Sequence, residues 1–327
     1  MKMLRNRILS VLCVIAIMLL AGCGAQNTTA KNGETTAAEA KPTKTINIAY
    51  QGGIGYAPIH VMETKNLIEK NYPGEIKVTF QKLDSGAAIN EGIIGGSIQI
   101  GCMGVAPAVS GAAAGIPYKI VSGLCAQSHG LMSNNPEIRT LADIKDTDKI
   151  ALVNTGSIQH ILLAMTAEKV LGDAHALDNN IQKMSHAEGM AALESGTVQL
   201  HLTSSPFIYQ ERANERYNEL TELNEVWPVG NTFLVAMASE SISEDQELFQ
   251  AVKKAFDEAI RFINEDRKGI VEIESRYLGL EPEEVEADLN QPECQFSAEL
   301  KGVQDMADFM YRAGFIEKEM KAEDLMF

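Results

Sequence analysis

The sequence predicts an α/β protein of two lobes, each a mostly parallel sheet flanked by helices. Short apolar runs typical of buried strands alternate with helical segments, an order that favours parallel sheets covered by helices. The alternation runs once through residues 45–127 and again through 128–229. A further strand and a long helical tail follow in 230–327. We therefore expect lobe one at 45–127 with 230–327, and lobe two at 128–229.

The first unit begins with an alternating run at 45–50, which predicts a strand. The Gly-rich turn after it, 51–56, lacks the GxGxxG spacing of a dinucleotide site, and this argues against nucleotide binding. A helix is expected at 57–70, with Pro58 tolerated in its first turn. The remaining elements are expected as strands at 75–80, 97–103 and 119–124, a helix to Ile94 capped by Asp84 or Ser85, and a helix opened by 104–107.

The second unit is organised around the stretch 154–160. The apolar run 149–153 before it predicts a buried strand, and the unbroken segment after it predicts a helix to about residue 171. Such a turn presents free backbone N–H groups and the positive end of the helix dipole, which suit an anionic or polar ligand. A plain N-cap is the alternative. The rest is expected as a crossing segment at 127–133, strands at 181–185 and 199–203, and helices at 187–195 and after Ser204.

The carboxyl-terminal third predicts one strand and several helices. The strand is expected at 231–237, where the chain can return to lobe one. Residues 244–264 form a long amphipathic pattern, because their apolar residues recur at spacings of three and four. Further helices are expected around 270–277, 282–290 and 298–313.

The amino terminus predicts export and lipid attachment. Three basic residues precede an apolar run at 8–20, as in a secretory signal peptide, and the run is too short for a comfortable membrane span. The sequence Leu20-Ala21-Gly22-Cys23 resembles the lipobox of bacterial lipoproteins, and an ordinary signal with a chance Cys is the alternative. We expect a signal peptide at 1–22, lipid on Cys23 that anchors the chain to the outer face of the membrane, and a flexible tether at 23–44.

Composition excludes several classes of function. The formal net charge of −16 argues against nucleic acid and anionic lipid surfaces as partners, and removal of the basic signal makes the chain more acidic. Cys102, Cys125 and Cys294 are odd in number and lack CxxC spacing, so we expect buried free thiols, although Cys102 and Cys125 both end apolar runs and could approach each other. The histidines form no i,i+4 pair and no HExxH motif, so neither a metal site nor a cofactor is expected.

Short motifs spread along 45–327 resemble one known family. The loop Tyr50-Gln51 with Gly55-Tyr56-Ala57-Pro58 is similar to the family's first loop. Ser85-Gly86 followed by Gly96-Ser97-Ile98-Gln99-Ile100 resembles its next run, with Gln99 where the family often has Asp. Further matches are Gly104-Val105-Ala106-Pro107, Gly115-Ile116-Pro117, Leu141-Ala142-Asp143-Ile144, Gly156-Ser157 and Gly314-Phe315-Ile316. The ordered set resembles extracytoplasmic solute-binding lipoproteins of ABC importers, in the branch for nitrate, sulfonates, taurine and pyrimidine precursors.

This resemblance implies a fold, partners and a role. The fold is a two-lobed periplasmic-binding-protein fold of type II, with the helical carboxyl-terminal part on lobe one. The partners are a small-molecule solute and a membrane permease with its ATPase subunits. The implied role is capture of a small anionic or polar organic solute, such as a sulfonate or nitrate, and delivery to the permease. A pyrimidine or thiamine precursor, an aromatic carboxylate, and sensing for a partner kinase are the alternatives.

The ligand is expected where the loops at the carboxyl ends of the strands face one another. None of these loops contains Arg or Lys, and Lys82 is the nearest basic residue. We therefore expect backbone N–H groups, hydroxyls and aromatic faces to hold the solute, although Tyr56, Met103 and Trp227 have core packing as an alternative. The predicted contacts are Gln51, Gly53, Tyr56, Ser85, Gly86, Met103, Gly104, Gln127, His129, Thr155, Gly156, Ser157, Ser204, Ser205, Phe207 and Trp227.

An enzyme is the rival class. A lipid-anchored hydrolase needs a nucleophile with a base, and the GxSxG motif is absent from the sequence. Ser157 and His160 are three residues apart, but such a pair needs a third group to act as a catalytic unit. A pyrimidine synthase of this fold would need a reactive Lys or a His and Cys cluster, which the sequence does not show. We therefore expect a binding protein, not an enzyme.

Overall fold

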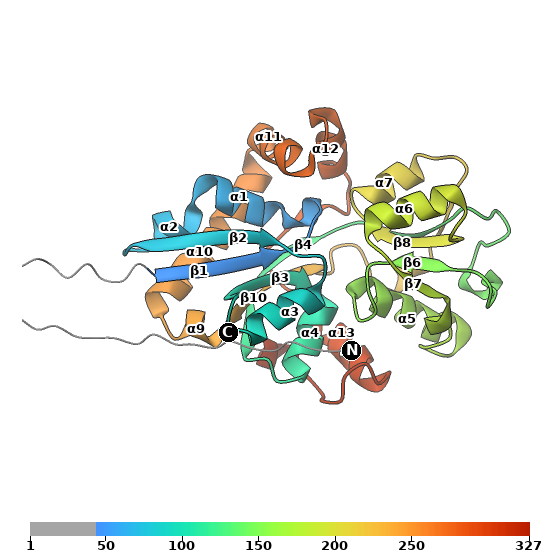
Figure 1. Ribbon diagram of the computed structural model, residues 1–327, viewed down its shortest axis with the longest axis horizontal. Coiled ribbons are helices and arrows are strands. Elements are labelled where there is room, and N and C mark those ends of the chain that lie inside the picture. The colour runs from blue at the N-terminus through green and yellow to red at the C-terminus, as the bar shows by residue number, and fades with distance from the viewer. Residues whose placement is uncertain (1–43) are drawn as a thin grey trace, which may run out of the picture. The chain divides into compact units, whose positions relative to one another are not determined.

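A computed structural model describes residues 44–327, and they form two sheets with helices on their faces (Figure 1). The expected signal peptide, Cys23 and nearly all of the tether lie outside the described residues. Among the described residues, no helix is long and apolar enough to cross a membrane. We call the parts around the six-stranded and the five-stranded sheet lobe one and lobe two.

The sheet of lobe one has the strand order β11-β4-β10-β3-β1-β2. The pairs β1–β2 and β1–β3 are parallel, whereas β10 lies between β3 and β4 and is antiparallel to both. The returning strand β10 is therefore central in the sheet. The strands are β1 (Lys44–Tyr50), β2 (Ile76–Lys82), β3 (Ile100–Gly104), β4 (Tyr118–Ala126), β10 (Leu234–Ser239) and β11 (Gln295–Phe296).

The sheet of lobe two has the order β7-β6-β8-β5-β9. Its first three strands are parallel neighbours, and β5 pairs antiparallel with both β8 and β9. The strands are β5 (His129–Ser133), β6 (Ile150–Leu152), β7 (Ile181–Lys183), β8 (Leu200–Ser204) and β9 (Asn218–Leu220).

Helices cover both faces of each sheet (Figure 1). In lobe one, α3 (Gly86–Ile94) and α4 (Val105–Ala113) pack on β3, with α13 (Val303–Arg312) behind α4. The amphipathic helix α10 (Gln246–Glu265) packs against α1 (Ala57–Lys65) and α2 (Leu67–Asn71), and α9 (Glu240–Ser243), α11 (Arg267–Leu278) and α12 (Pro282–Leu289) complete this lobe. Lobe two carries α5 (Ile158–Leu171), α6 (His186–Ser195), α7 (Phe207–Arg212) and α8 (Leu223–Val226).

The chain crosses between the sheets twice. The first crossing is only Gln127 and Ser128, and the second runs from the end of α8 at Val226 to the start of β10 at Leu234. The structure corrects the expected crossing at 127–133, because His129–Ser133 form the buried strand β5. This run does not alternate between apolar and polar residues and it contains Gly130, so its pattern did not distinguish it from a connection. The exact lobe boundaries stay a prediction.

Two further differences have a local cause. The expected helix at 57–70 is two helices, because Asn66 adopts a left-handed conformation with φ 51° and ends α1. Asn tolerates this conformation better than most residues, since its short polar side chain bonds locally. The short elements β9, α8 and β11 were not expected, because two to four residues are too few to show a period.

Candidate functional site

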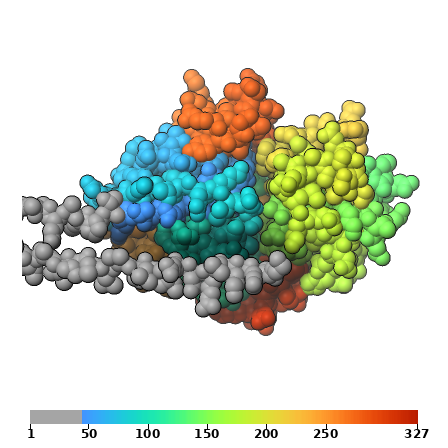
Figure 2. Space-filling view, in the orientation of Figure 1, coloured from blue at the N-terminus to red at the C-terminus, as the bar shows by residue number. Residues whose placement is uncertain are grey.

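A cavity of about 220 Å³ lies between the two sheets, at the ends of their strands. Its wall combines residues of both lobes, whose surfaces meet along a seam in the space-filling view (Figure 2). The lining residues are Gln51, Gly52, Tyr56, Ser85, Gly86, Ala87, Asn90, Gly104, Pro107, Ser110, Gln127, Val153, Asn154, Thr155, Gly156, Ser157, Ile158, Gln159, His186, Ser204, Phe233 and Leu234.

The lobe-one wall is built by the ends of β1 and β3 and by two helix N-termini. Ser85 caps α3, because its hydroxyl accepts a hydrogen bond from the Ala88 N–H at 3.2 Å. The packing between α3 and α4 is close: a Cβ on Gly86 would lie 2.8 Å from the Pro107 side chain. The Tyr56 hydroxyl donates to Gln51 Oε1 at 3.1 Å and holds the first loop in place.

The lobe-two wall is the turn between β6 and α5 together with the start of α6. Ser157 caps α5 by accepting a hydrogen bond from the His160 N–H at 3.2 Å. Gly156 has φ 78°, a left-handed conformation that favours glycine, and its N–H donates to His160 Nδ1 at 2.9 Å. The turn is thus held by hydrogen bonds of polar side chains, whereas in the opposite wall close packing of Gly86 on Pro107 adds to such hydrogen bonds.

The electrostatics of the cavity come from backbone and neutral groups. The helices α3, α4, α5 and α6 all contribute residues of their first turn to the wall, so four positive helix ends face the same space. None of the described residues that line it is Lys, Arg, Asp or Glu. At its rim, the ammonium of Lys82 lies beside Gly52, since a Cβ added there would come within 2.7 Å of Nζ. This arrangement favours a small anion over a cation.

One titratable side chain of the wall, His186, departs strongly from its ordinary protonation behaviour. Protein atoms surround the ring, and burial, with a smaller contribution from His201, lowers the pKa of His186 to about 3. Although the side chain keeps some accessible surface in the cavity, it is therefore neutral at physiological pH. Its Nε2 lies 3.2 Å from the Gln159 amide nitrogen and accepts from it, so its Nδ1–H faces the Thr203 hydroxyl at 3.2 Å.

The structure brings ten of the sixteen predicted contact residues to the cavity wall. Six come from lobe one and its crossing, and four come from lobe two. They are Gln51, Tyr56, Ser85, Gly86, Gly104, Gln127, Thr155, Gly156, Ser157 and Ser204. That these residues contact a solute stays a prediction.

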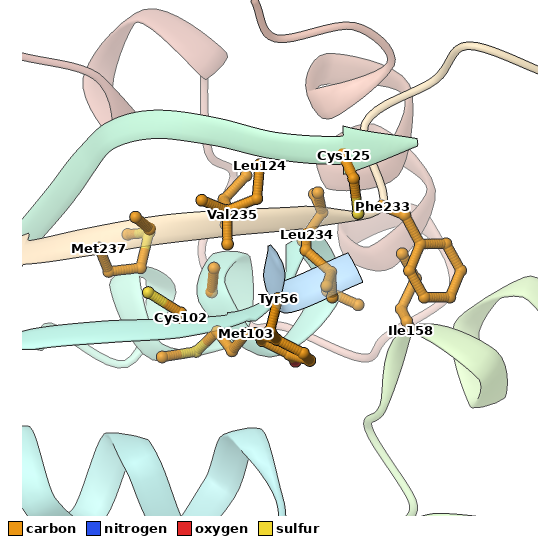
Figure 3. Close-up of a cluster of buried hydrophobic side chains, with 14 of the residues drawn as sticks. Tyr56, Cys102, Met103, Leu124, Cys125, Ile158, Phe233, Leu234, Val235 and Met237 are labelled. Carbon is orange, nitrogen blue, oxygen red and sulfur yellow. The ribbon is translucent and has the colours of Figure 1, made fainter. Parts of the chain in front are cut away.

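The other six predicted residues do not line this cavity. Met103 is fully buried in the lobe-one core (Figure 3), because its side chain points away from the strand end. Gly53 and Ser205 lie against each other, and Phe207 packs near His186, with ring centres 5.8 Å apart. His129 and Trp227 line a second cavity of about 20 Å³ at the crossings, which is too small for an organic solute.

Sequence reasoning missed several residues of the wall. Asn90, Pro107 and Ser110 lie on α3 and α4 on the face that points to the cavity, and the helical spacing from Gly86 and Gly104 was a usable signal for them. His186 was findable as the first residue after the cap Ser185. Phe233 and Leu234 could not be found in this way. They reach the wall because β10 pairs with β3, which no local pattern shows (Figure 3).

The two lobes touch at the cavity through Ile158 and Gly104. A Cβ on Gly104 would lie 3.0 Å from Ile158 Cγ2, so the glycine lets the first residue of α5 approach β3 closely. Figure 3 shows Ile158 beside the ring of Phe233, which precedes β10. This contact sets how closely the walls approach each other.

The tempting Ser157–His160 pair is not arranged as a nucleophile with its base. The His160 ring turns away from the Ser157 hydroxyl: its Nδ1 accepts from Gly156 N–H, and its Nε2 lies 3.2 Å from Asp178 Oδ1. The Ser157 hydroxyl is held by the backbone of His160 instead. In the part of the chain that the structure describes, no group of three His, Cys, Asp or Glu residues could hold a metal ion. Cys102, Cys125 and Cys294 are free thiols, and the first two are buried.

The chain matches a family model, the NMT1-like family, over residues 39–273. It belongs to the NMT1-like family. Two relatives carry the name putative aliphatic sulfonates-binding protein. The one from Bacillus subtilis (strain 168) is 26% identical over 328 residues, which cover 97% of this chain and 93% of the relative. The one from Escherichia coli (strain K12) is 26% identical over 251 residues, which cover 75% and 74%.

Solved structures show the same two-lobed periplasmic-binding-protein fold. The alkanesulfonate-binding protein from Xanthomonas axonopodis pv. citri, bound to MOPS, aligns with a TM-score of 0.71 at 22% identity and covers 88% of this chain and 99% of its own. The periplasmic nitrate-binding protein from Synechocystis PCC 6803 aligns with a TM-score of 0.69 at 14% identity and covers 86% and 85%. At these identities the likeness shows the fold.

Proposed function

We propose that this member of the NMT1-like family is the solute-binding component of an ABC importer. It captures a small organic anion, with an alkanesulfonate as the first candidate, in the cavity between its lobes. It then delivers the solute to a permease with ATPase subunits, and lipid on Cys23 anchors it on the outer face of the membrane. The relatives named as sulfonate-binding proteins support the solute class.

The observation that carries the proposal is the charge pattern of the cavity. Four helix N-termini face a space of about 220 Å³ whose lining includes no acidic side chain, and Lys82 stands at the rim. Oriented N–H groups hold anions without a basic side chain, because the partial charges of the helix ends sum in one place. The volume is below the roughly 300–1,000 Å³ of pockets for drug-sized ligands, which favours a solute with a short carbon chain.

Binding without turnover is part of the same proposal. The relatives are named as binding proteins, and the Ser157 hydroxyl has no side-chain base directed at it. Hydrolysis of esters or peptides by the purified protein, lost on Ser157→Ala, would contradict this.

The test is a comparison of solutes that differ in one charge. Ethanesulfonate and taurine share a sulfonate, but taurine adds an ammonium group that finds no carboxylate in the cavity wall. We expect ethanesulfonate to bind at least about tenfold more tightly in calorimetry, because an unpaired buried charge costs more than 1 kcal/mol. A ligand at 100 times its Kd adds about 2.7 kcal/mol of stability, so the same order should appear in melting temperatures.

The control solutes are nitrate, bicarbonate, benzoate and a neutral pyrimidine. If only the pyrimidine stabilises the protein, the proposal of an anionic solute is wrong, and a pyrimidine-precursor-binding protein is favoured. Tighter binding of taurine than of ethanesulfonate would show that a carboxylate outside the described cavity wall reaches the solute.

A further inference from the structure

The tail of lobe one contacts lobe two at His175. The ring nitrogens of His175 have one partner each: Nδ1 lies 2.8 Å from Asp178 Oδ2, and Nε2 lies 2.9 Å from the carbonyl oxygen of Ala313. Both partners accept hydrogen bonds, so both ring nitrogens must donate, and only the imidazolium form has two N–H groups. In agreement, the hydrogen bonds to Ala313 and Asp178 raise the pKa of His175.

The other oxygen of Asp178 continues the chain of contacts to the cavity. Asp178 Oδ1 lies 3.2 Å from His160 Nε2, and His160 Nδ1 accepts the Gly156 N–H at 2.9 Å. Since Nδ1 accepts, His160 is the neutral tautomer that donates from Nε2. Burial lowers the pKa of His160, which keeps this ring neutral. Hydrogen bonds therefore connect the Ala313 carbonyl of lobe one to an amide of the cavity wall in lobe two.

Apolar and ionic contacts surround this chain of hydrogen bonds. The Phe315 ring packs edge-on against His160, with ring centres 5.3 Å apart, and lies tilted against His175, with ring centres 4.8 Å apart. The turn at Gly314, with φ 78°, follows α13 and brings Phe315 to this position. Beside it, Arg312 of lobe one pairs with Glu168 of α5 at 2.8 Å, a second contact between the lobes.

We propose that His160, Asp178 and His175 form a latch between the lobes. The latch positions the Thr155–Ser157 turn for solute binding when lobe one engages His175, and it weakens at alkaline pH. This inference rests on the proposed function, since it gives these three residues a positioning role in the same cavity.

The direction of the pH dependence follows from the charge of His175. Its neighbours on lobe two are Asp173, Asp178 and His160, and the facing segment of lobe one offers the Ala313 carbonyl and Arg312, which is paired with Glu168. With the lobes joined, the pKa of His175 is raised, so the latch is fully present below the ordinary value of about 6.5. It is lost as the pH rises through the raised value, because the neutral ring can satisfy only one of its two acceptors.

The first experiment measures the Kd of ethanesulfonate, which stays ionised throughout, by calorimetry from about pH 6 to about pH 9. We expect the wild type to bind about two- to fivefold more weakly at the alkaline end, the range of a partly exposed ion pair. His175→Gln should bind ethanesulfonate weakly at every pH, and its Kd should not change with pH. A His175→Gln variant that keeps the slope of the wild type would overturn the latch.

Arg312→Gln is the matched control. It also removes a contact between the lobes, but the guanidinium does not titrate in this range. We expect a modest loss of affinity at every pH and the same slope as the wild type. A flat profile for Arg312→Gln would show that the slope belongs to lobe contact in general, and would overturn the assignment to His175.

A second pair of variants separates the two bonds of His160. Asn at this position keeps an acceptor near Nδ1 for the Gly156 N–H, whereas Gln keeps a donor near Nε2 for Asp178. We expect His160→Asn to retain more of the affinity than His160→Gln, by about threefold or more, as expected for the loss of one hydrogen bond. Equal affinities in both variants, with melting temperatures unchanged, would overturn the positioning of the turn.

Ring-proton NMR of the solute-free protein distinguishes failure of the latch from failure of the proposed function. We expect His175 to titrate above its ordinary range because of Ala313 and Asp178, and Asp178→Asn to lower the pKa of His175 part of the way back. If these shifts appear and no sulfonate binds at any pH, the solute proposal fails while the contact between the lobes stands. If sulfonate binds and His175 titrates normally in both proteins, the latch is wrong.

Discussion

The two walls of the cavity present the same feature, a capped helix N-terminus, but they are held in different ways. On lobe one, Ser85 and Gly86 are fixed by close contact with Pro107 of the next helix. On lobe two, the Gly156–Ser157 turn is held by hydrogen bonds that end on ionisable side chains. Solute binding should therefore be sensitive to side-chain volume at the lobe-one wall and to the protonation of histidines at the lobe-two wall.

The largest expected effect is on the contact between the walls. In Gly104→Val, branched methyl groups would extend a Cβ that already lies 3.0 Å from Ile158. We expect the Kd for ethanesulfonate to rise more than about tenfold, because overpacking costs about 1–3 kcal/mol. Calorimetry measures the Kd, and the melting temperature of the solute-free protein shows whether the fold survives.

Ile158→Ala provides the partner variant for a double-mutant cycle. We expect it to restore part of the affinity of Gly104→Val, since it removes Ile158 Cγ2, the atom nearest to the added Cβ, and keeps Ile158 Cβ. If the losses of affinity in the double variant are additive, the two residues act independently. The interpretation that side-chain volume limits the lobe-one wall would then be wrong.

The next effect is a loss of stability in acid, carried by histidines of lobe two. Burial lowers the pKa of His129 to about 4, so the folded protein resists the proton that the unfolded chain accepts near pH 6.5. Stability is then fully present above about pH 6.5 and is lost as the pH falls toward 4. Between about pH 6.5 and 5 we expect a loss of about 1–2 kcal/mol in urea unfolding.

His129→Phe keeps a ring against Phe233, whose centre lies 5.5 Å away, and removes the titration. We expect its free energy of unfolding to fall less steeply in acid than that of the wild type. An unchanged acid slope would mean that other groups carry the effect.

The smallest expected effect comes from removing the helix cap of either wall. Ser85→Ala and Ser157→Ala each remove one side-chain hydrogen bond to a first-turn N–H, at 3.2 Å in both cases. We expect each to lower the free energy of unfolding by about 1 kcal/mol. In Ser157→Ala the Kd should also rise more than in Ser85→Ala, because the turn on lobe two lacks the packing that supports Gly86. Equal changes in Kd would remove the distinction between the walls.

Much of the fold and part of the site could be predicted because their signals are local. The turn before a helix shows in residues such as Ser85, Gly86 and Thr155–Ser157, where cap chemistry and an apolar run stand side by side. The expectation of two α/β lobes followed from the order of such turns. The two sheets found here, and the solved structures that share the fold, agree with it.

The rest depends on contacts that no local pattern encodes. Phe233 reaches the cavity because β10, which begins at the next residue, inserts between β3 and β4. His175 contacts Ala313, which lies 138 residues further along the chain. The strand His129–Ser133 was missed for a related reason: it pairs with β8 and β9, all five of its residues are buried, and a strand buried on both faces needs no alternation.

The central position of β10 also has a consequence for how the chain becomes folded. Lobe two is one continuous segment, so its sheet can form from residues near one another in the sequence. The sheet of lobe one joins β3 to β4 only through β10, which arrives after all of lobe two. During synthesis, the strands of lobe two can therefore pair first, whereas β3 and β4 cannot complete their sheet until β10 has been made. Long-range pairing of this kind is slow, because the entropy of closing the loop is lost before the stabilising contacts form.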